Sequence, residues 1–109
     1  MPLTREFRET VKVRAECDPE FRIGLFREAI EALLSDDLAT GKVLLRDYVN
    51  ASVGFETLAN ELEKSPKSLM RMLSNKGNPR ADNLLAMVAC LKRREGLSLS
   101  LNRDERLHA

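Results

Sequence analysis

The sequence contains one histidine, two cysteines and no long run of apolar residues. His108 stands beside the C-terminus, and the sequence shows no Ser/His/Asp or Cys/His arrangement and no glycine-rich phosphate loop. Carboxylates are plentiful, but they fall on the polar faces of amphipathic segments, where solvation explains them. We therefore expect a protein that is not an enzyme and that needs neither a cofactor nor a metal ion.

The few cysteines and the missing apolar run also bear on cellular location. Cys17 and Cys90 lie far apart, which favours reduced thiols over a disulfide. No apolar run approaches the roughly 20 residues that a membrane span needs, and the first residues mix charges where a secretory signal would be apolar. The sequence predicts a cytoplasmic protein without a membrane segment.

Length and composition indicate one globular domain. The 109 residues include 43% hydrophobic and 32% charged side chains, a balance typical of soluble globular proteins. We divide this domain into N-terminal helices over 1–52, a helix-turn-helix core over 53–95, and a C-terminal strand and tail over 96–109.

Apolar residues recur at helical spacing through almost the whole chain. They predict helices over 4–16, 19–34, 38–50, 55–62, 66–74 and 81–95. Asp18 before Pro19 is typical of a helix start, and Gly96 of a helix end. Gly41 weakens the first turn of the third helix. The expected core residues of that helix are Leu38, Val43, Leu44, Tyr48 and Val49. In the last helix, helical spacing is restored by Leu84, Leu85, Met87, Val88 and Leu91.

Leucine and serine alternate strictly over 97–101, which is the two-residue period of a half-buried strand. A lone strand cannot satisfy its backbone groups, so it needs a partner, which another chain could supply. The expected fold class is an all-α bundle of about five to six helices with a short C-terminal β-strand.

The two short helices over 55–62 and 66–74 are joined by only three residues, as in a helix-turn-helix. Ser65 is placed to cap the second helix, and Pro66 suits its first position. One face of this second helix is apolar and would pack on the first, through Leu69, Met72 and Leu73 against Leu58, Ala59 and Leu62. The opposite face is polar and cationic, which suits reading of the DNA major groove; it carries Lys67, Ser68, Arg71 and Ser74.

Charge is distributed unevenly, although the net charge is only +1. Residues 1–63 hold 8 Lys and Arg against 13 Asp and Glu, whereas residues 64–109 hold 10 against 4. The stretch 64–81 carries five cations and no acid. Such asymmetry favours a polyanion-binding face. The alternative is a helical hairpin whose basic face is simply solvated.

Particular residues of this region resemble the lambda-repressor-like (Cro/cI, XRE) helix-turn-helix family over roughly 55–91. They are Leu58, Ala59, Ser65, Leu69, Arg71, Met72, Gly77, Asn78, Pro79 and Leu84. The runs 54–59, 66–73 and 77–79 are more closely similar to the HigA-type addiction-module antidote proteins. That resemblance extends through 28–34 and 44–51, and so covers most of the chain.

The resemblance implies a homodimeric repressor that binds a double-stranded DNA operator, represses its own operon and neutralises a RelE/ParE-like (HigB-type) toxin. It places the DNA contacts at eight positions, the last three near phosphate: Ser65, Pro66, Lys67, Ser68, Arg71, Asn75, Lys76 and Asn78.

Two residues depart from the pattern of the general family. Glu63 stands where glycine is preferred at the turn, which predicts a strained positive φ. Phe55 stands where glutamine is frequent, which removes one expected DNA contact. A stand-alone helix-turn-helix regulator, or a protein-interaction module that does not bind DNA, remains the alternative function.

Overall fold

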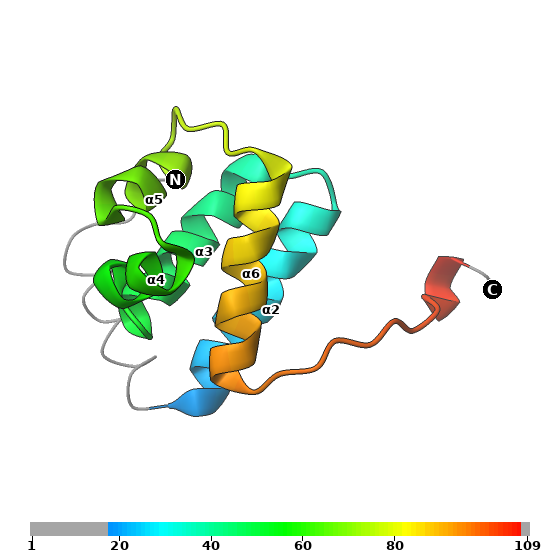
Figure 1. The fold of residues 1–109 in the computed structure, drawn as a ribbon. Helices are drawn as coiled ribbons and strands as arrows, with labels where there is room; N and C mark the ends of the chain where they lie inside the picture. Colours follow the sequence, from blue (N-terminus) through cyan, green and yellow to red (C-terminus); the bar gives the residue numbers. More distant parts are fainter. Residues whose placement is uncertain (1–17, 108–109) are drawn as a thin grey trace.

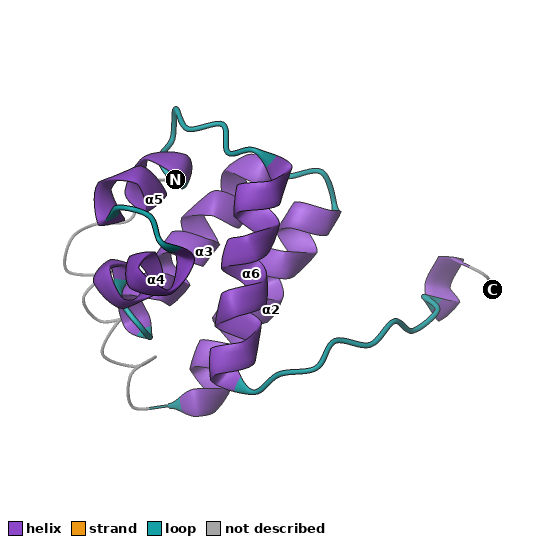
Figure 2. Ribbon diagram, in the orientation of Figure 1, coloured by secondary structure: helices purple, strands orange, loops and turns teal. Residues whose placement is uncertain are grey.

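Five α-helices follow one another in the computed structural model, which describes residues 18–107 (Figure 1). They are α2 (Pro19–Leu34), α3 (Leu38–Ala51), α4 (Phe55–Leu62), α5 (Pro66–Met72) and α6 (Ala81–Glu95), followed by a short 3-10 turn (Glu105–Leu107). The described residues contain helices and loops but no strand, so the all-α prediction is confirmed (Figure 2). The predicted helix over 4–16, like Cys17, lies outside the described residues.

The helix boundaries follow from local chemistry. The Asp18 carboxylate accepts the Glu20 and Phe21 N–H groups at 3.1 and 3.3 Å, and Asp37 accepts from Thr40 at 3.2 Å. Both aspartates therefore satisfy N–H groups that a helix start leaves without a partner. Gly96 adopts φ 72°, the left-handed conformation that ends a helix without steric cost, so its predicted role is confirmed.

The core lies where α2, α3, α4 and α6 meet. Helices α2 and α3 pack along one another, α6 runs across them, and α4 and α5 lie together on the other side (Figure 1). Phe26 and Tyr48 form an aromatic pair with ring centroids 5.1 Å apart. The other large side chains that are fully buried are Leu45, Val49, Leu58, Leu69, Leu73, Met87, Cys90 and Leu91.

The predicted core face of α3 is partly wrong. Leu38 and Val43 are exposed, whereas Gly41, Lys42 and Leu45 are buried. A Cβ added to Gly41 would lie 2.4 Å from Cδ2 of Leu33, so the glycine lets α3 approach α2 closely. Because glycine and lysine are not apolar residues, the spacing of apolar residues did not identify Gly41 and Lys42 as part of the buried face of this helix.

In helix α6, one apolar residue at helical spacing lies outside the core. Met87 and Leu91 are buried and Leu84 and Val88 pack against the core, whereas Leu85 is 65% exposed. A helix packed on one side can bury only one stripe of its surface, and Leu85 lies outside that stripe.

The predicted strand over 97–101 is not formed in this chain. Residues 97–104 have no regular secondary structure and lead away from the helices (Figure 1). Leu97 packs against the core, whereas Leu99 is 58% and Leu101 96% exposed. No described segment forms a backbone ladder with this stretch, and a strand requires one.

A polar cluster joins α2, α3 and α6 at their common end. Glu95 accepts from Arg22 Nε at 2.7 Å, from Arg22 Nη2 at 3.0 Å and from the Tyr48 hydroxyl at 2.6 Å. The hydrogen bonds from Arg22 lower the pKa of Glu95 below its ordinary value. Burial, and then the hydrogen bond to Glu95, raise the pKa of Tyr48 far above its ordinary value, so Tyr48 remains a donor.

This cluster makes the stability of the fold depend on pH. A carboxyl group whose pKa is lowered by folding stabilises the native state above its unfolded pKa of about 4.3, and that contribution is lost as pH falls through the folded pKa. We expect Glu95→Gln to lower the free energy of unfolding by about 1–3 kcal/mol at pH 7. The difference in unfolding free energy between the variant and the wild type should narrow below about pH 4.

Urea unfolding followed by circular dichroism, at pH 7 and in acid, measures the difference in unfolding free energy between variant and wild type at each pH. Glu56→Gln is the matched control, because Glu56 is exposed on α4 and has no ion pair among the described residues. A Glu95→Gln difference that is the same at both pH values would contradict this assignment.

Candidate nucleic-acid interface

Helices α4 and α5 are the two short helices, joined by three residues, that the sequence predicts. Leu58 and Ala59 of α4 are buried, as are Leu69 of α5 and Leu73 at its end. Ala59 is small, which allows close packing between helices. Leu62 and Met72 pack against the same cluster while remaining partly exposed. The apolar face that was predicted to join the two helices is therefore confirmed.

The turn between them depends on Glu63. This residue adopts φ 56° and ψ 43°, the left-handed conformation that glycine takes more easily, so the predicted positive φ is confirmed. The conformation is stabilised by the Lys64 N–H, which donates to Ala59 O at 3.0 Å, and by the Glu63 N–H, which donates to Asn60 O at 3.3 Å. These hydrogen bonds close α4 and direct the chain into α5.

Helix α5 begins as predicted and ends two residues early. Ser65 Oγ accepts the Ser68 N–H at 3.1 Å, and Pro66 occupies the first position, where a missing N–H is harmless. The helix ends at Met72 rather than Ser74, and the Ser74 hydroxyl donates to Arg71 O at 2.7 Å. The last turn is thus completed by a side chain.

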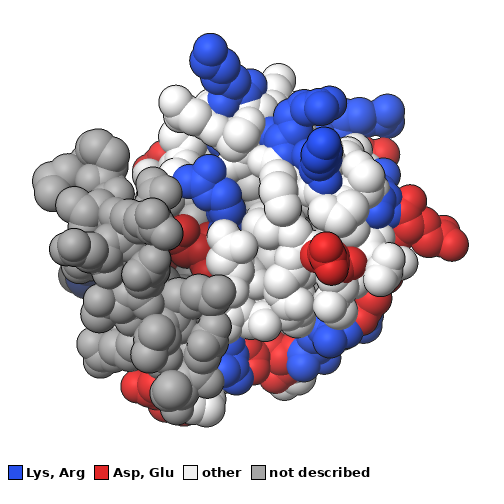
Figure 3. Space-filling view, turned by 90° about the vertical axis from the view of Figure 1, so that its left-hand side faces the viewer, with Lys and Arg blue, Asp and Glu red and all other residues white. Residues whose placement is uncertain are grey.

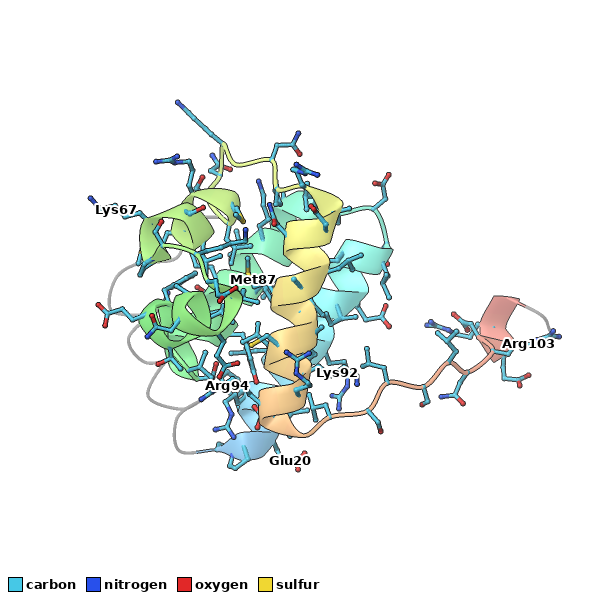
Figure 4. All side chains as sticks on the ribbon, viewed as in Figure 1. Glu20, Lys67, Met87, Lys92, Arg94 and Arg103 are labelled. Atoms are coloured by element: carbon cyan, nitrogen blue, oxygen red, sulfur yellow. The ribbon has the colours of Figure 1, made fainter. Side chains whose placement is uncertain are left out.

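The eight predicted contact residues are accessible to different degrees. Pro66 and Ser68 are half-buried and the other six are exposed. Lys67 points away from the body of the molecule (Figure 4). Four of the eight line one open depression of about 400 Å³ at the end of α5: Ser68, Arg71, Lys76 and Asn78. Ser65, Pro66, Lys67 and Asn75 are not part of its lining.

Positive charge gathers on this side of the molecule. Figure 3 faces the side with α4 and α5, and Lys and Arg predominate over its upper part. Arg80 pairs with Asp82 at 3.3 Å, but no described carboxylate pairs with Lys67, Arg71 or Lys76. Within the described residues, these cations are therefore available to an anionic ligand.

Phe55 has a structural role at the position where the general family often has glutamine. It is 6% exposed and belongs to the core cluster, and it follows Gly54, whose φ of 81° redirects the chain into α4. The side chain at position 55 therefore offers no polar group to a ligand.

The opposite side of α4 is fixed to α6. Cys90 donates to Glu61 Oε2 at 2.8 Å, and Glu61 also pairs with Arg94. Burial, and then the hydrogen bond to Glu61, raise the pKa of the Cys90 thiol, which leaves little of the reactive thiolate at neutral pH. These contacts hold α4 in position.

One residue beside the depression was not predicted from the sequence. Lys42 of α3 is only 6% exposed, and its Nζ donates to Gly77 O at 2.6 Å. The only feature of the sequence that could have indicated its burial is its position, next to Gly41 and three residues before Leu45 on the buried face of α3. A lysine on a buried face needs hydrogen-bond partners, and the loop supplies them.

The described residues contain no group of three or more His, Cys, Asp or Glu side chains that could hold a metal ion. None of the helices within 18–107 combines the length and apolar character required to cross a membrane. Comparisons with models of protein families, with curated proteins and with solved structures found no match to this chain.

Proposed function

We propose that this protein is a sequence-specific repressor that binds double-stranded DNA through a lambda-repressor-like helix-turn-helix. The observation that carries the proposal is the two-sided character of α5. Leu69 and Leu73 anchor it on α4, while Lys67 and Arg71 extend into solvent with no described carboxylate to neutralise them. A capped helix that displays cations and short polar groups suits entry into the major groove.

We further propose that it acts as a homodimer, because one helix-turn-helix gathers too few contacts for a selective operator. Exposed apolar side chains supply a surface for protein contact. Leu34, Leu99 and Leu101 border a groove between α2 and the tail, together with Ile23 and Ile30. Two such surfaces related by a twofold axis would cover one another.

The resemblance to HigA-type proteins supports a more specific role, that of an antitoxin which represses its own operon and neutralises a HigB-type toxin. The alternative is a stand-alone regulator, or an interaction module that does not bind DNA. The exposed leucines of the groove are compatible with the antitoxin role and with both alternatives. Whether a neighbouring reading frame encodes a toxin of about 100 residues would distinguish the antitoxin from these alternatives.

The salt dependence of binding to the DNA upstream of the gene tests the proposal. If about three cations of each protomer contact phosphates, log K should fall against log salt with a slope of roughly −5, at about 0.9 per phosphate. The candidates are Lys64, Lys67, Arg71, Lys76 and Arg80, all exposed. Fluorescence anisotropy across a salt series gives the slope, and unrelated DNA gives the non-specific level. A slope near zero would mean that the basic face is only solvated.

A further inference from the structure

The loop between α5 and α6 carries three of the eight expected contact residues, Asn75, Lys76 and Asn78. These side chains are exposed, and the loop has little regular structure of its own. Within it, the Gly77 N–H donates to Ser74 O at 3.0 Å. One such turn hydrogen bond is a weak restraint for a segment that must hold ligand-binding side chains.

Lys42 supplies a restraint from outside the loop. Its Nζ donates to Gly77 O at 2.6 Å and lies 3.5 Å from Asn75 O, so a single ammonium engages both ends of this short turn. Lys42 is 6% exposed and has no ion pair with a described carboxylate. Backbone carbonyl oxygens therefore provide much of the compensation that a buried charge requires.

Gly77 is also held tightly against α5. A Cβ added at this position would lie 2.0 Å from Arg71 O and 2.8 Å from Met72 O. The loop backbone thus packs directly against the end of α5, and only a glycine at position 77 allows so close an approach. This packing sets Lys76 and Asn78 beside Arg71 around the depression.

We propose that Lys42 is a positioning residue for DNA binding. Its buried ammonium fixes the turn 75–77 from α3, and so places Lys76 and Asn78 next to Arg71 without itself reaching the ligand. The inference rests on the proposed DNA-binding function and adds to it a residue outside the helix-turn-helix. Through this ammonium, which carbonyl oxygens hold, α3 is linked to the loop that carries part of the proposed binding face.

Lys42→Met tests this directly, since methionine keeps much of the side-chain volume and removes the donor. In the free protein, NMR should show shifted amide signals at 75–78 and faster hydrogen exchange at Gly77, with the signals of α2 and α6 unchanged. With operator DNA, affinity should weaken. The salt slope should become shallower by about 0.9 for each phosphate that the loop no longer reaches, or about 2 for two protomers.

Lys92→Met is the matched control. Lys92 is a half-buried lysine in the last turn of α6, away from α5, and the substitution removes the same charge (Figure 4). It should change neither the loop signals nor the salt slope. If Lys42→Met does not fold, Gly77→Ala provides a second route, because the added Cβ must displace the same loop from Arg71 O. That variant should reproduce the shallower slope.

The two hypotheses fail in different ways. If the wild-type protein binds no duplex DNA, the proposed function is wrong. If the wild type binds, but Lys42→Met leaves the loop signals and the salt slope unchanged, the positioning role is overturned. A loss of thermal stability with an unchanged slope would also overturn it, since it would show that Lys42 supports only the fold.

Discussion

Replacing Arg71 by alanine should reduce operator affinity by roughly 5–150-fold, about 1–3 kcal/mol, while leaving the fold nearly unchanged. Arg71 is exposed on α5 and lines the depression with Lys76 and Asn78. Its guanidinium has no ion pair among the described residues, so the substitution breaks no salt bridge within that part of the chain. The hydrogen bond that Arg71 accepts from Ser74 involves its backbone and survives the substitution.

Anisotropy titrations of operator and unrelated DNA give the two affinities, and circular dichroism checks the helices. Arg93→Ala is the control, since Arg93 is an exposed arginine at the far end of α6. A base contact by Arg71 predicts a larger loss on operator than on unrelated DNA. An unchanged operator affinity with intact helicity would remove Arg71 from the interface.

Disrupting the proposed dimer should have a still larger effect. We expect Leu99→Ser combined with Leu101→Ser to shift the protein toward monomers and to weaken operator binding by roughly 10²–10⁴-fold, because the second half-site then gains nothing from the first. Leu101 is 96% and Leu99 58% exposed, so neither serine removes a buried side chain from the monomer. The groove beside α2 offers the apolar surface that these leucines would cover in a partner.

Light scattering at micromolar concentration reports the mass of wild type and variant. Val43→Ser is the control, because Val43 is 41% exposed on α3 and does not line the groove. A dimer that survives both substitutions would place the contact on the helices, where Leu34 and Leu85 are exposed. A wild type that is monomeric in solution and on DNA would refute the dimer itself.

The elements that could be predicted from the sequence are those governed by local rules. Helix α4 and helix α6 have the predicted boundaries, and α5 begins at the predicted residue. Caps and turns such as Ser65, Glu63 and Gly96 depend on hydrogen bonds and φ angles within a few residues. The exposure of Lys67 and Arg71 followed from the 3.6-residue period alone.

The errors occur where distant segments decide the outcome. Leu38 and Val43 were expected in the core from their helical spacing, yet both are exposed. The alternation over 97–101 has the period of a strand, but no second strand meets it in the described part of the chain. Burial and pairing need a partner surface, and a pattern within one segment does not specify that surface.

The sequence by itself determined the all-α class, the bounds of α4, the first residue of α5 and the cationic face of α5, because each depends on residues a turn or two apart. Only the tertiary structure decided three contacts between elements. Helix α3 approaches α2 at Gly41, and Glu95 accepts hydrogen bonds from both Arg22 and Tyr48. Lys42 donates a hydrogen bond to the loop at Gly77. The partners in these contacts lie on different elements, up to 73 positions apart. Such contacts form only once the helices pack, since their geometry is set by the packed helices and not by local sequence.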